Sequence, residues 1–353
     1  AQAGQPGFQA RQLTLGEHKM PFVLLRKEEA PVPEEGRALF ICMHGGGSYP
    51  KAEGPHAWPI NTREWQSQVA IAAQVYAGEG IFFVPRMADD RLGRWPHAHN
   101  QDAFNAVIEH GIREWHVDPN RVYLMGISEG CYGTQILGPF MPDRFGGASA
   151  MAGGVGADIP AENLRNLAFR TDVGENDTTF DRVGLAREYH SRMDELAKTW
   201  GGYTNSLNVQ EGKGHGIDYS PGPAWMIEHQ REAFPETIVW TAAPLHGKRR
   251  PAIYWLGFEP NDPNQTARLS ATLKDNAIDL TALDKQREPL GDFVLTLMLN
   301  DNMVDLDKPI SVKINGKEQK IDTPKRSIES LARTLKERGD PTYAFPVILK
   351  LES

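Results

Sequence analysis

The stretch YLMGISEGCYG, residues 123–133, joins the end of a strand pattern to the start of a helix pattern through a glycine-flanked serine. Apolar residues lead into Gly126, and one residue separates Ser128 from Gly126 and one separates it from Gly130. A sharp strand-to-helix turn strains its central residue, and glycines on either side remove side chains that would clash there. The pattern predicts Ser128 as an exposed nucleophile; the alternative is a glycine-rich turn with an ordinary capping serine.

The composition is that of a globular chain with a mild acidic excess. Hydrophobic residues make up 40% of the 353 residues and charged residues 24%, which is typical of a packed fold. The length suits one large domain or two smaller ones. The formal net charge of −8 argues against a nucleic-acid partner. No apolar run reaches the about 18 residues that span a bilayer, so no membrane partner is expected either.

The start of the chain and its cysteines bear on its location. The chain opens with AQAGQPGFQA and no initiator Met, which favours a removed signal peptide and a secreted or periplasmic protein over a trimmed start. The two cysteines, Cys42 and Cys131, lack the spacing of a metal site or a disulfide framework. Both fall in expected buried elements, so we expect two free core thiols, with a single bridge as the alternative.

Strand and helix patterns alternate between residue 37 and about residue 235. This alternation predicts a parallel sheet covered by helices on both faces, within a catalytic domain over residues 1–240. The expected strands are 11–15, 22–26, 37–43, 80–85, 120–127, 146–154, 167–174 and 203–210. The expected helices are one capped by Asn61 or Thr62, 102–115, one from Ser128 to about Gly138, 182–199 and 223–233.

The composition changes after Phe234. The segment TAAPLHGKRRP, residues 241–251, is interpreted as a linker, and residues 241–353 as a smaller, mostly-β accessory domain. Within it, Asn315 and Gly316 predict a hairpin with a type I′ turn. One helix is expected near 326–338.

The segment HGGG, residues 44–47, directly follows the expected strand 37–43. Consecutive glycines let backbone N–H groups point at a ligand without obstruction. In acyl transfer, such groups hold the developing oxyanion together with the N–H of the residue after the nucleophile, here Glu129. We therefore predict an oxyanion hole from Glu129 and from Gly45 or Gly46; the alternative is a flexible turn.

A serine nucleophile needs a general base, because its hydroxyl is weak on its own. In chains with this turn motif the order is Ser, then Asp or Glu, then His. His215 lies in the glycine-rich loop EGKGHGID after the last expected strand of the first domain, and it is the predicted base. The alternatives are His190 and His229, which lie in helix patterns, and His246, which lies in the linker.

The third catalytic group should be a carboxylate that orients the histidine. It should follow the strand LAFRTDVG, and Asp177 lies in the loop GENDTTFD directly after it. Asp177 is therefore the predicted acid. The alternatives are Asp172, Glu175 and Asp181.

Two loops are expected to roof the site, residues 48–65 and 86–100. Their aromatic side chains could form flat platforms for a sugar or aryl group, or could pack the loops together. The candidate substrate-binding residues are His44, Tyr49, Trp58 and Trp95.

The second roof loop also carries cationic and metal-binding residue types. Arg91 and Arg94 could bind a carboxylate bidentately, although solvated arginines are more common. His97 and His99 could share a metal ion, but no carboxylate or cysteine stands at a ligand spacing from them, which favours loop packing. No metal and no cofactor is expected.

Four segments together resemble a known family: DPNRVYLMGISEGCYGTQ, MPDRFGGASAMAGG, GENDTTF and GKGHG. Residues 37–235 look like the α/β-hydrolase superfamily, and these segments resemble exported serine esterases related to polyhydroxybutyrate depolymerases and feruloyl esterases. The resemblance implies Ser128, Asp177 and His215 as the triad. In one departure, Glu129 places a carboxylate beside the nucleophile, where it would repel an anionic acyl group.

The sequence thus predicts a serine carboxylic-ester hydrolase that removes small acyl or aryl-acyl groups from a carbohydrate-like carrier. A serine peptidase of the prolyl-oligopeptidase type shares the triad and is the enzymatic alternative. The alternative outside enzymes is a non-catalytic polysaccharide-binding protein on a hydrolase fold.

Overall fold

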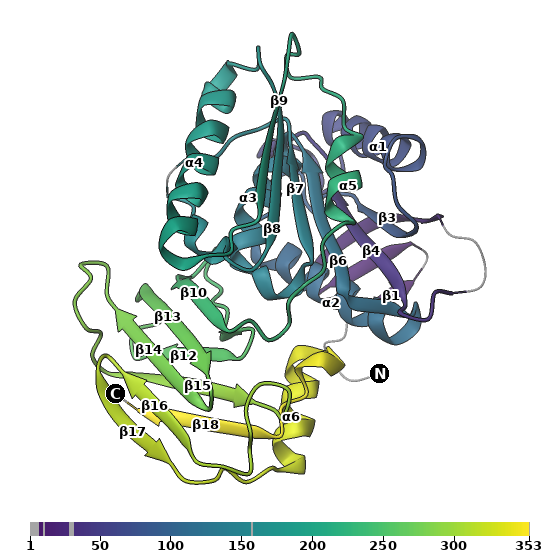
Figure 1. Cartoon of the computed structure of the whole chain (residues 1–353). Helices are drawn as coiled ribbons and strands as arrows, with labels where there is room; N and C mark the ends of the chain where they lie inside the picture. The colour runs from purple at the N-terminus through teal and green to yellow at the C-terminus, as the bar shows by residue number, and fades with distance from the viewer. Residues whose placement is uncertain (1–6, 10, 28–31, 157, 353) are drawn as a thin grey trace. The chain divides into compact units, whose positions relative to one another are not determined.

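The computed structural model describes residues 7–9, 11–27, 32–156 and 158–352. The chain divides into two compact units that meet between Arg231 and Glu232 (Figure 1). The boundary predicted between residues 240 and 241 instead falls inside a strand, β10 (Thr237–Ala242). This strand pairs with β13 (Ala267–Lys274) of the second unit, so the start of the predicted linker is part of a sheet.

A mostly parallel sheet forms the centre of the first unit. Over the described residues its strand order is β1-β2-β3-β5-β4-β6-β7-β8-β9. The neighbours from β5 to β9 run parallel, whereas β1, β2 and β3 add on antiparallel at one edge. The strands are β1 Gly7–Gln9, β2 Gln12–Leu15, β3 His18–Lys27, β4 Arg37–Met43, β5 Gly80–Pro85, β6 Val117–Ile127, β7 Gly147–Met151, β8 Ala168–Gly174 and β9 Asn205–Gln210.

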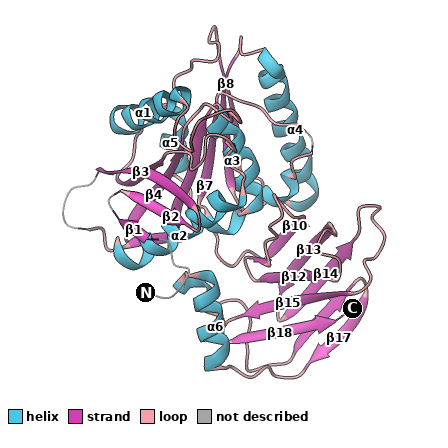
Figure 2. Cartoon of the chain, turned by 180° about the vertical axis from the view of Figure 1, so that it is seen from behind, coloured by secondary structure: helices cyan, strands magenta, loops and turns pink. Residues whose placement is uncertain are grey.

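Helices cover both faces of this sheet (Figure 2). Residues of α1 and α5 share one apolar cluster with Phe40 of β4, so both pack on the same face. Gly111 of α2 lies against Leu39, which points to the opposite face because side chains alternate along a strand. In both views α3 and α4 lie on the side away from α1 and α5. The helices are α1 Pro59–Gln74, α2 Ala98–Glu114, α3 Glu129–Phe140, α4 Arg182–Trp200 and α5 Pro221–Met226.

Strands β4 and β5 show why the sequence pattern predicts a buried parallel sheet. Every residue of β5 is buried, and every residue of β4 after Arg37 is buried as well. A strand covered on both faces needs apolar side chains at consecutive positions rather than at alternate ones. The runs RALFICM and GIFFVP meet that need.

Three helix boundaries differ from the predictions. Helix α1 begins at Pro59, not after Asn61 or Thr62, because proline suits the first turn of a helix, where its missing N–H is not needed. Helix α2 begins at Ala98, four residues before the predicted start at Asp102. Helix α5 spans only Pro221–Met226, whereas a helix over 223–233 was expected.

The second unit contains two sheets and a helix. In the described residues, one sheet has the order β10-β13-β14-β16-β17 and the other β11-β12-β15-β18. One apolar cluster contains side chains of both sheets, including Trp240 and Phe258, so the sheets share a core. The remaining elements are β11 Ala252–Ile253, β12 Leu256–Pro260, β14 Ala277–Leu283, β15 Phe293–Leu299, β16 Ile310–Ile314, β17 Lys317–Ile321, α6 Ile328–Arg338 and β18 Val347–Glu352.

The predicted hairpin joins β16 to β17. Asn315 and Gly316 have φ of 46° and 83°, as a type I′ turn requires. The Asn315 side chain also accepts a hydrogen bond from the N–H of Ala282 at 2.9 Å. This contact ties the turn to β14, a strand that the sequence analysis did not predict.

Cys42 and Cys131 are both buried and free, as expected. Burial raises the pKa of each thiol well above its ordinary value, because a thiolate is poorly solvated there. Within the described ranges, no helix combines the length and the apolar character that crossing a membrane would require.

Candidate active site

Ser128 occupies the sharp turn between β6 and α3. Its φ of 57° and ψ of −109° are strained for a residue with a side chain. A methyl group on Gly126 would lie 2.4 Å from the carbonyl oxygen of Gly130, and one on Gly130 would lie 2.3 Å from that of Met43. Both flanking glycines are therefore required by close backbone approach, as the G-x-S-x-G pattern predicts.

Three side chains form a continuous hydrogen-bonded chain at this turn. His215 Nε2 lies 3.0 Å from Ser128 Oγ, and His215 Nδ1 lies 2.7 Å from Asp177 Oδ2. Asp177 is 3% exposed, whereas His215 is exposed. If the buried carboxylate accepts a hydrogen bond from Nδ1–H, Nε2 is unprotonated and can take a proton from the serine. The arrangement meets the geometric requirements of a nucleophile, a base and an orienting acid.

The loops that carry the acid and the histidine are joined by backbone contacts. A methyl group on Gly174 would lie 2.0 Å from the carbonyl oxygen of Gly214, so the two loops meet at glycine. The N–H of Asn176 donates to the carbonyl of Lys213 at 2.8 Å. Glu175, an alternative acid, instead accepts from the N–H of Gly212 and holds the loops together.

Arg182 at the start of α4 was not anticipated from the sequence. Its Nη1 donates to Asp177 Oδ1 at 2.8 Å, and its Nε donates to the hydroxyl of Tyr132 at 2.9 Å. The guanidinium thus fixes the carboxylate oxygen that His215 does not use. No spacing rule connects an arginine to a triad acid, so sequence reasoning had no signal for it.

The other candidate acids and bases lie apart from Ser128 or have other partners. Asp172 is fully buried and accepts from Arg170 and Asn208. His190 contacts Thr171 and Asn205 through its two ring nitrogens. The candidates that are not hydrogen-bonded to Ser128 or His215 are Asp172, Glu175, Asp181, His190, His229 and His246.

The HGGG segment lies against the serine. A methyl group on Gly45 would lie 3.4 Å from Ser128 Cβ. Within the described part of the chain, the N–H groups of Gly45, Gly46 and Glu129 have no hydrogen-bond partner. Glu129 also begins α3, where the helix dipole favours negative charge. These N–H groups are available to an oxyanion beside Ser128 Oγ.

A buried polar network that the sequence analysis missed holds this segment in place. Asn61 Oδ1 accepts from the N–H of Gly47, and Asn61 Nδ2 donates to the carbonyl of Gly47 and to Asp90. Asp90 is also bound bidentately by Arg86, and every member of the network is buried. A methyl group on Gly46, whose φ is 102°, would lie 2.0 Å from Asn61 Oδ1.

Two of the predicted substrate-binding residues are fully buried and belong to the scaffold. His44 Nε2 accepts from the N–H of Met87 at 3.0 Å, and Nδ1 faces the carbonyl of Gly45 at 2.6 Å, so Nδ1 carries the proton. Trp95 Nε1 donates to the carbonyl of His44 at 3.0 Å. Neither ring is exposed, so neither is positioned to bind substrate in this structure.

His44 should make the stability of the protein depend on pH. Burial lowers its pKa from 6.5 to about 3. Below pH 6.5, His44 therefore binds a proton in the unfolded chain but stays neutral in the folded chain. Stability is therefore lost as the pH falls through 6.5 toward about 3. Between pH 7.5 and 5.0 this loss is about 2 kcal/mol.

Urea unfolding of wild type and His44→Gln at the two pH values measures this loss. Glutamine keeps one donor and one acceptor and does not titrate. We expect the free energy of unfolding to fall by about 2 kcal/mol more in wild type than in the variant. An equal fall in both proteins would contradict the assignment of a buried, neutral His44.

Glu129 forms an ion pair beside the nucleophile. Its Oε1 lies 2.7 Å from Arg94 Nε, and its side chain is 6% exposed. Burial raises the pKa of this carboxyl to about 7, although Arg94 opposes the shift. The carboxylate that follows the nucleophile is thus paired, which the sequence analysis did not foresee.

The remaining candidates from the roof loops contact one another or neighbouring residues, and His99 lies in α2. Tyr49 and Trp58 stack with ring centroids 5.7 Å apart, and Tyr49 is 42% exposed. Arg91 binds Asp89 bidentately. The rings of His97 and His99 stack on each other. Among the described residues, no group of three or more His, Cys, Asp or Glu side chains could hold a metal ion.

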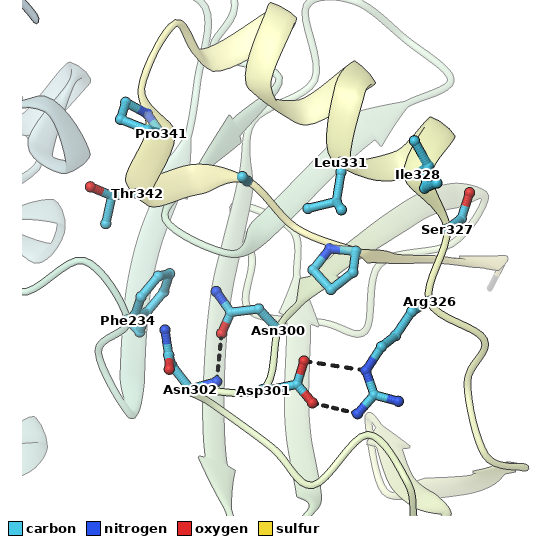
Figure 3. Close-up of a pocket in the computed structure, with 12 residues that line it drawn as sticks. Phe234, Asn300, Asp301, Asn302, Arg326, Ser327, Ile328, Leu331, Pro341 and Thr342 are labelled. Atoms are coloured by element: carbon cyan, nitrogen blue, oxygen red, sulfur yellow. Dashed lines mark hydrogen bonds and ion pairs between the residues drawn. The ribbon is translucent and has the colours of Figure 1, made fainter.

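The second unit contains a cavity of about 620 Å³ (Figure 3). Asp301 pairs with Arg326 across it, and the Asn300 side chain accepts from the N–H of Asn302. It is lined by Phe234, Asn300, Asp301, Asn302, Arg326, Ser327, Ile328, Leu331, Pro341, Thr342, Ala344 and Pro346. Since this lining holds neither a histidine nor a cysteine, the cavity offers no comparable nucleophile and base.

Comparisons with known proteins add distant similarities. No protein-family model matches the chain. The protein named "Putative esterase NocK" from Nocardia uniformis subsp. tsuyamanensis is 30% identical over 144 residues, which make up 41% of each chain. The match thus spans about two fifths of the length of that relative.

Solved structures with similar folds include esterases and a peptidase. A thermostable esterase is 19% identical with a TM-score of 0.43, covering 60% of both chains. A ferulic acid esterase is 13% identical with a TM-score of 0.37, covering 56% of this chain and 86% of its own. A "putative dipeptidyl aminopeptidase IV" from Bacteroides ovatus is 15% identical with a TM-score of 0.42, covering 64% of this chain and 35% of its own.

The strand order and the glycine-flanked serine between β6 and α3 define the class of the first unit, which has the α/β-hydrolase fold. The chain is similar to esterases of this type. Fold alone does not establish an activity, so the function has to be argued from the site.

Proposed function

We propose that the chain is a serine carboxylic-ester hydrolase. The observation that carries this proposal is the hydrogen-bonded chain from Ser128 Oγ through His215 to Asp177. The unpartnered N–H groups beside Ser128 add a place for the oxyanion. Nucleophile, base, orienting acid and oxyanion donors are the parts that acyl transfer requires.

The mechanism follows from these positions. Ser128 Oγ attacks the ester carbonyl carbon while His215 Nε2 takes the hydroxyl proton. The oxyanion accepts hydrogen bonds from the N–H of Glu129 and of Gly45 or Gly46. The tetrahedral intermediate collapses, and His215 gives the proton to the departing alcohol. Water then attacks the acyl-serine with His215 as base, which releases the acid and restores Ser128.

We infer a small acyl or aryl-acyl group on a carbohydrate-like carrier as the substrate. The stacked, partly exposed pair Tyr49 and Trp58 supports this inference, because flat aromatic faces bind sugar and aryl rings. Residues 232–353 are proposed as an accessory domain, since they have an apolar core of their own.

Comparing esters with amides tests the proposed function. We expect measurable kcat/KM on p-nitrophenyl acetate and butyrate, and none on the matching anilides or on proline-containing peptides, because an alcohol leaves an acyl centre more readily than an amine does. Ser128→Ala serves as the control for both substrate classes. Anilide cleavage that disappears in Ser128→Ala would instead identify a serine peptidase.

A further inference from the structure

Arg94 pairs with the residue that follows Ser128, and its backbone is held in an unusual conformation. Its Nε contacts the carboxyl of Glu129, the residue that follows Ser128. Its φ of 56° is a conformation that residues with side chains rarely adopt, so its surroundings must enforce it. The buried ring of Trp95 fixes the chain on one side, and Asn100 donates to the Arg94 carbonyl at 3.2 Å.

Glu129 holds the Arg94 guanidinium at one edge only. Arg94 Nε and Glu129 Oε1 are the atoms of this ion pair that lie closest. Within the described residues, Nη1 and Nη2 donate no hydrogen bond, and the side chain is 52% exposed. Two parallel N–H donors of a positioned guanidinium match the two oxygens of a carboxylate.

The partner of Arg94 does not simply cancel its charge. A buried carboxyl with a pKa of about 7 is protonated in about half of the molecules at neutral pH and in more of them below it. The Arg94–Glu129 pair then carries a net positive charge. The repulsion that a carboxylate at position 129 would exert on an anionic substrate is thereby reduced.

A second carboxylate restricts where an anionic group can lie. Glu64 of α1 approaches Gly45, since a methyl group there would lie 3.2 Å from Glu64 Oε2. Glu64 is 32% exposed and contacts Arg63 at 2.9 Å. The charges at the oxyanion segment therefore disfavour an anion beside Glu64 and favour one beside Arg94.

We propose that Arg94 binds a carboxylate of the substrate, so that the preferred esters carry an anionic group near the scissile bond. Glu129 positions the guanidinium, and Nη1 and Nη2 bind the two carboxylate oxygens. This specificity rests on the proposed ester hydrolysis. The anionic group belongs either to the acyl part or to the alcohol part, and the substrates below distinguish the two.

Two matched pairs of esters test the proposal in the full chain. The acyl pair is mono-p-nitrophenyl adipate and p-nitrophenyl butyrate, and the alcohol pair is 4-acetoxybenzoate and phenyl acetate. The readout is the ratio of kcat/KM for the anionic ester to that for the neutral ester. In Arg94→Gln we expect this ratio to fall by about 10- to 100-fold in one pair of esters, because the substrate carboxylate loses a charge-assisted hydrogen bond.

The companion variants separate recognition from general effects. Arg94→Lys keeps the positive charge but loses the two parallel N–H donors of the guanidinium, so we expect an intermediate ratio. Arg91→Gln, a half-exposed arginine of the same loop that is paired with Asp89, should leave the ratio at the wild-type value. The pair of esters whose ratio falls identifies the part of the substrate that carries the anion.

The outcomes separate this inference from the proposed function. An unchanged ratio in both pairs, with neutral esters still hydrolysed, would overturn the role of Arg94 and leave the esterase standing. An equal fall for neutral and anionic esters would show that Arg94 only stabilises Glu129. A wild-type protein that hydrolyses none of the four esters would overturn the proposed function itself.

Discussion

Ser128→Ala should lower kcat for p-nitrophenyl butyrate by at least about 10⁴-fold, because the variant has no nucleophile for His215 to activate. Ser128 is half-buried, and the only side-chain hydrogen bond of its hydroxyl in the described residues is with His215 Nε2. The fold should therefore survive, and thermal melting should give a Tm within a few degrees of wild type.

Ser220→Ala is the matched control for this substitution. The Ser220 hydroxyl donates to Asp218, in the segment that follows the His215 loop, and it does not contact Ser128. We expect wild-type turnover from this variant. Turnover that persists in Ser128→Ala, or that disappears equally in both variants, would contradict the assignment of the nucleophile.

Asp177→Asn should lower kcat by about 10⁴-fold while KM changes little. The amide offers an N–H where His215 Nδ1 needs an acceptor, which favours the wrong tautomer of the imidazole. It also weakens the ion pair with Arg182, so some loss of stability should accompany the loss of turnover. Steady-state kinetics and thermal melting measure the two effects separately.

Asp172→Asn distinguishes a catalytic carboxylate from a structural one. Asp172 is buried and paired with Arg170, and it has no contact with His215. Its neutralisation leaves a buried guanidinium without its counter-charge, so we expect a lower Tm and a kcat close to wild type. The opposite pattern, with turnover lost in Asp172→Asn and kept in Asp177→Asn, would move the acid to Asp172.

Much of the first unit could be predicted from local patterns. The runs at β4 and β5 are buried on both faces, and their bounds coincide with the predicted strands. The starts of α1 and α5 were misplaced although Pro59 and Pro221 mark them locally, because proline is favoured in the first turn of a helix. Strand β10 was missed because the segment that begins at residue 241, inside this strand, was interpreted as a linker.

The candidate site shows the same division between local and long-range signals. Ser128 and the HGGG segment lie in short motifs in which close packing requires glycine at several positions. The structure places His215 and Asp177 within hydrogen-bonding distance of this turn. The contacts that support them have no such motif. Arg182 binds Asp177 from a helix start, and Arg94 reaches Glu129 from a loop 35 positions earlier in the chain.

Burial also decides whether an aromatic side chain can contact substrate. His44 and Trp95 stand where the sequence suggests a substrate platform, yet both are fully buried, and Trp95 Nε1 donates to the carbonyl of His44. Composition cannot show whether an aromatic side chain in a loop turns inward or outward. That choice is settled by partners remote in sequence, such as Met87, whose N–H donates to His44 Nε2.

The reaction of the protein with a fluorophosphonate tests the central claim most directly, because this reagent forms a stable adduct with an activated serine. Intact mass should show one adduct per chain, and peptide mapping should place it on Ser128. Prior labelling should abolish ester hydrolysis, and Ser128→Ala should remain unlabelled. An adduct on another residue, or an unlabelled wild-type protein that still hydrolyses esters, would contradict the account of Ser128 as the nucleophile activated by His215 and Asp177.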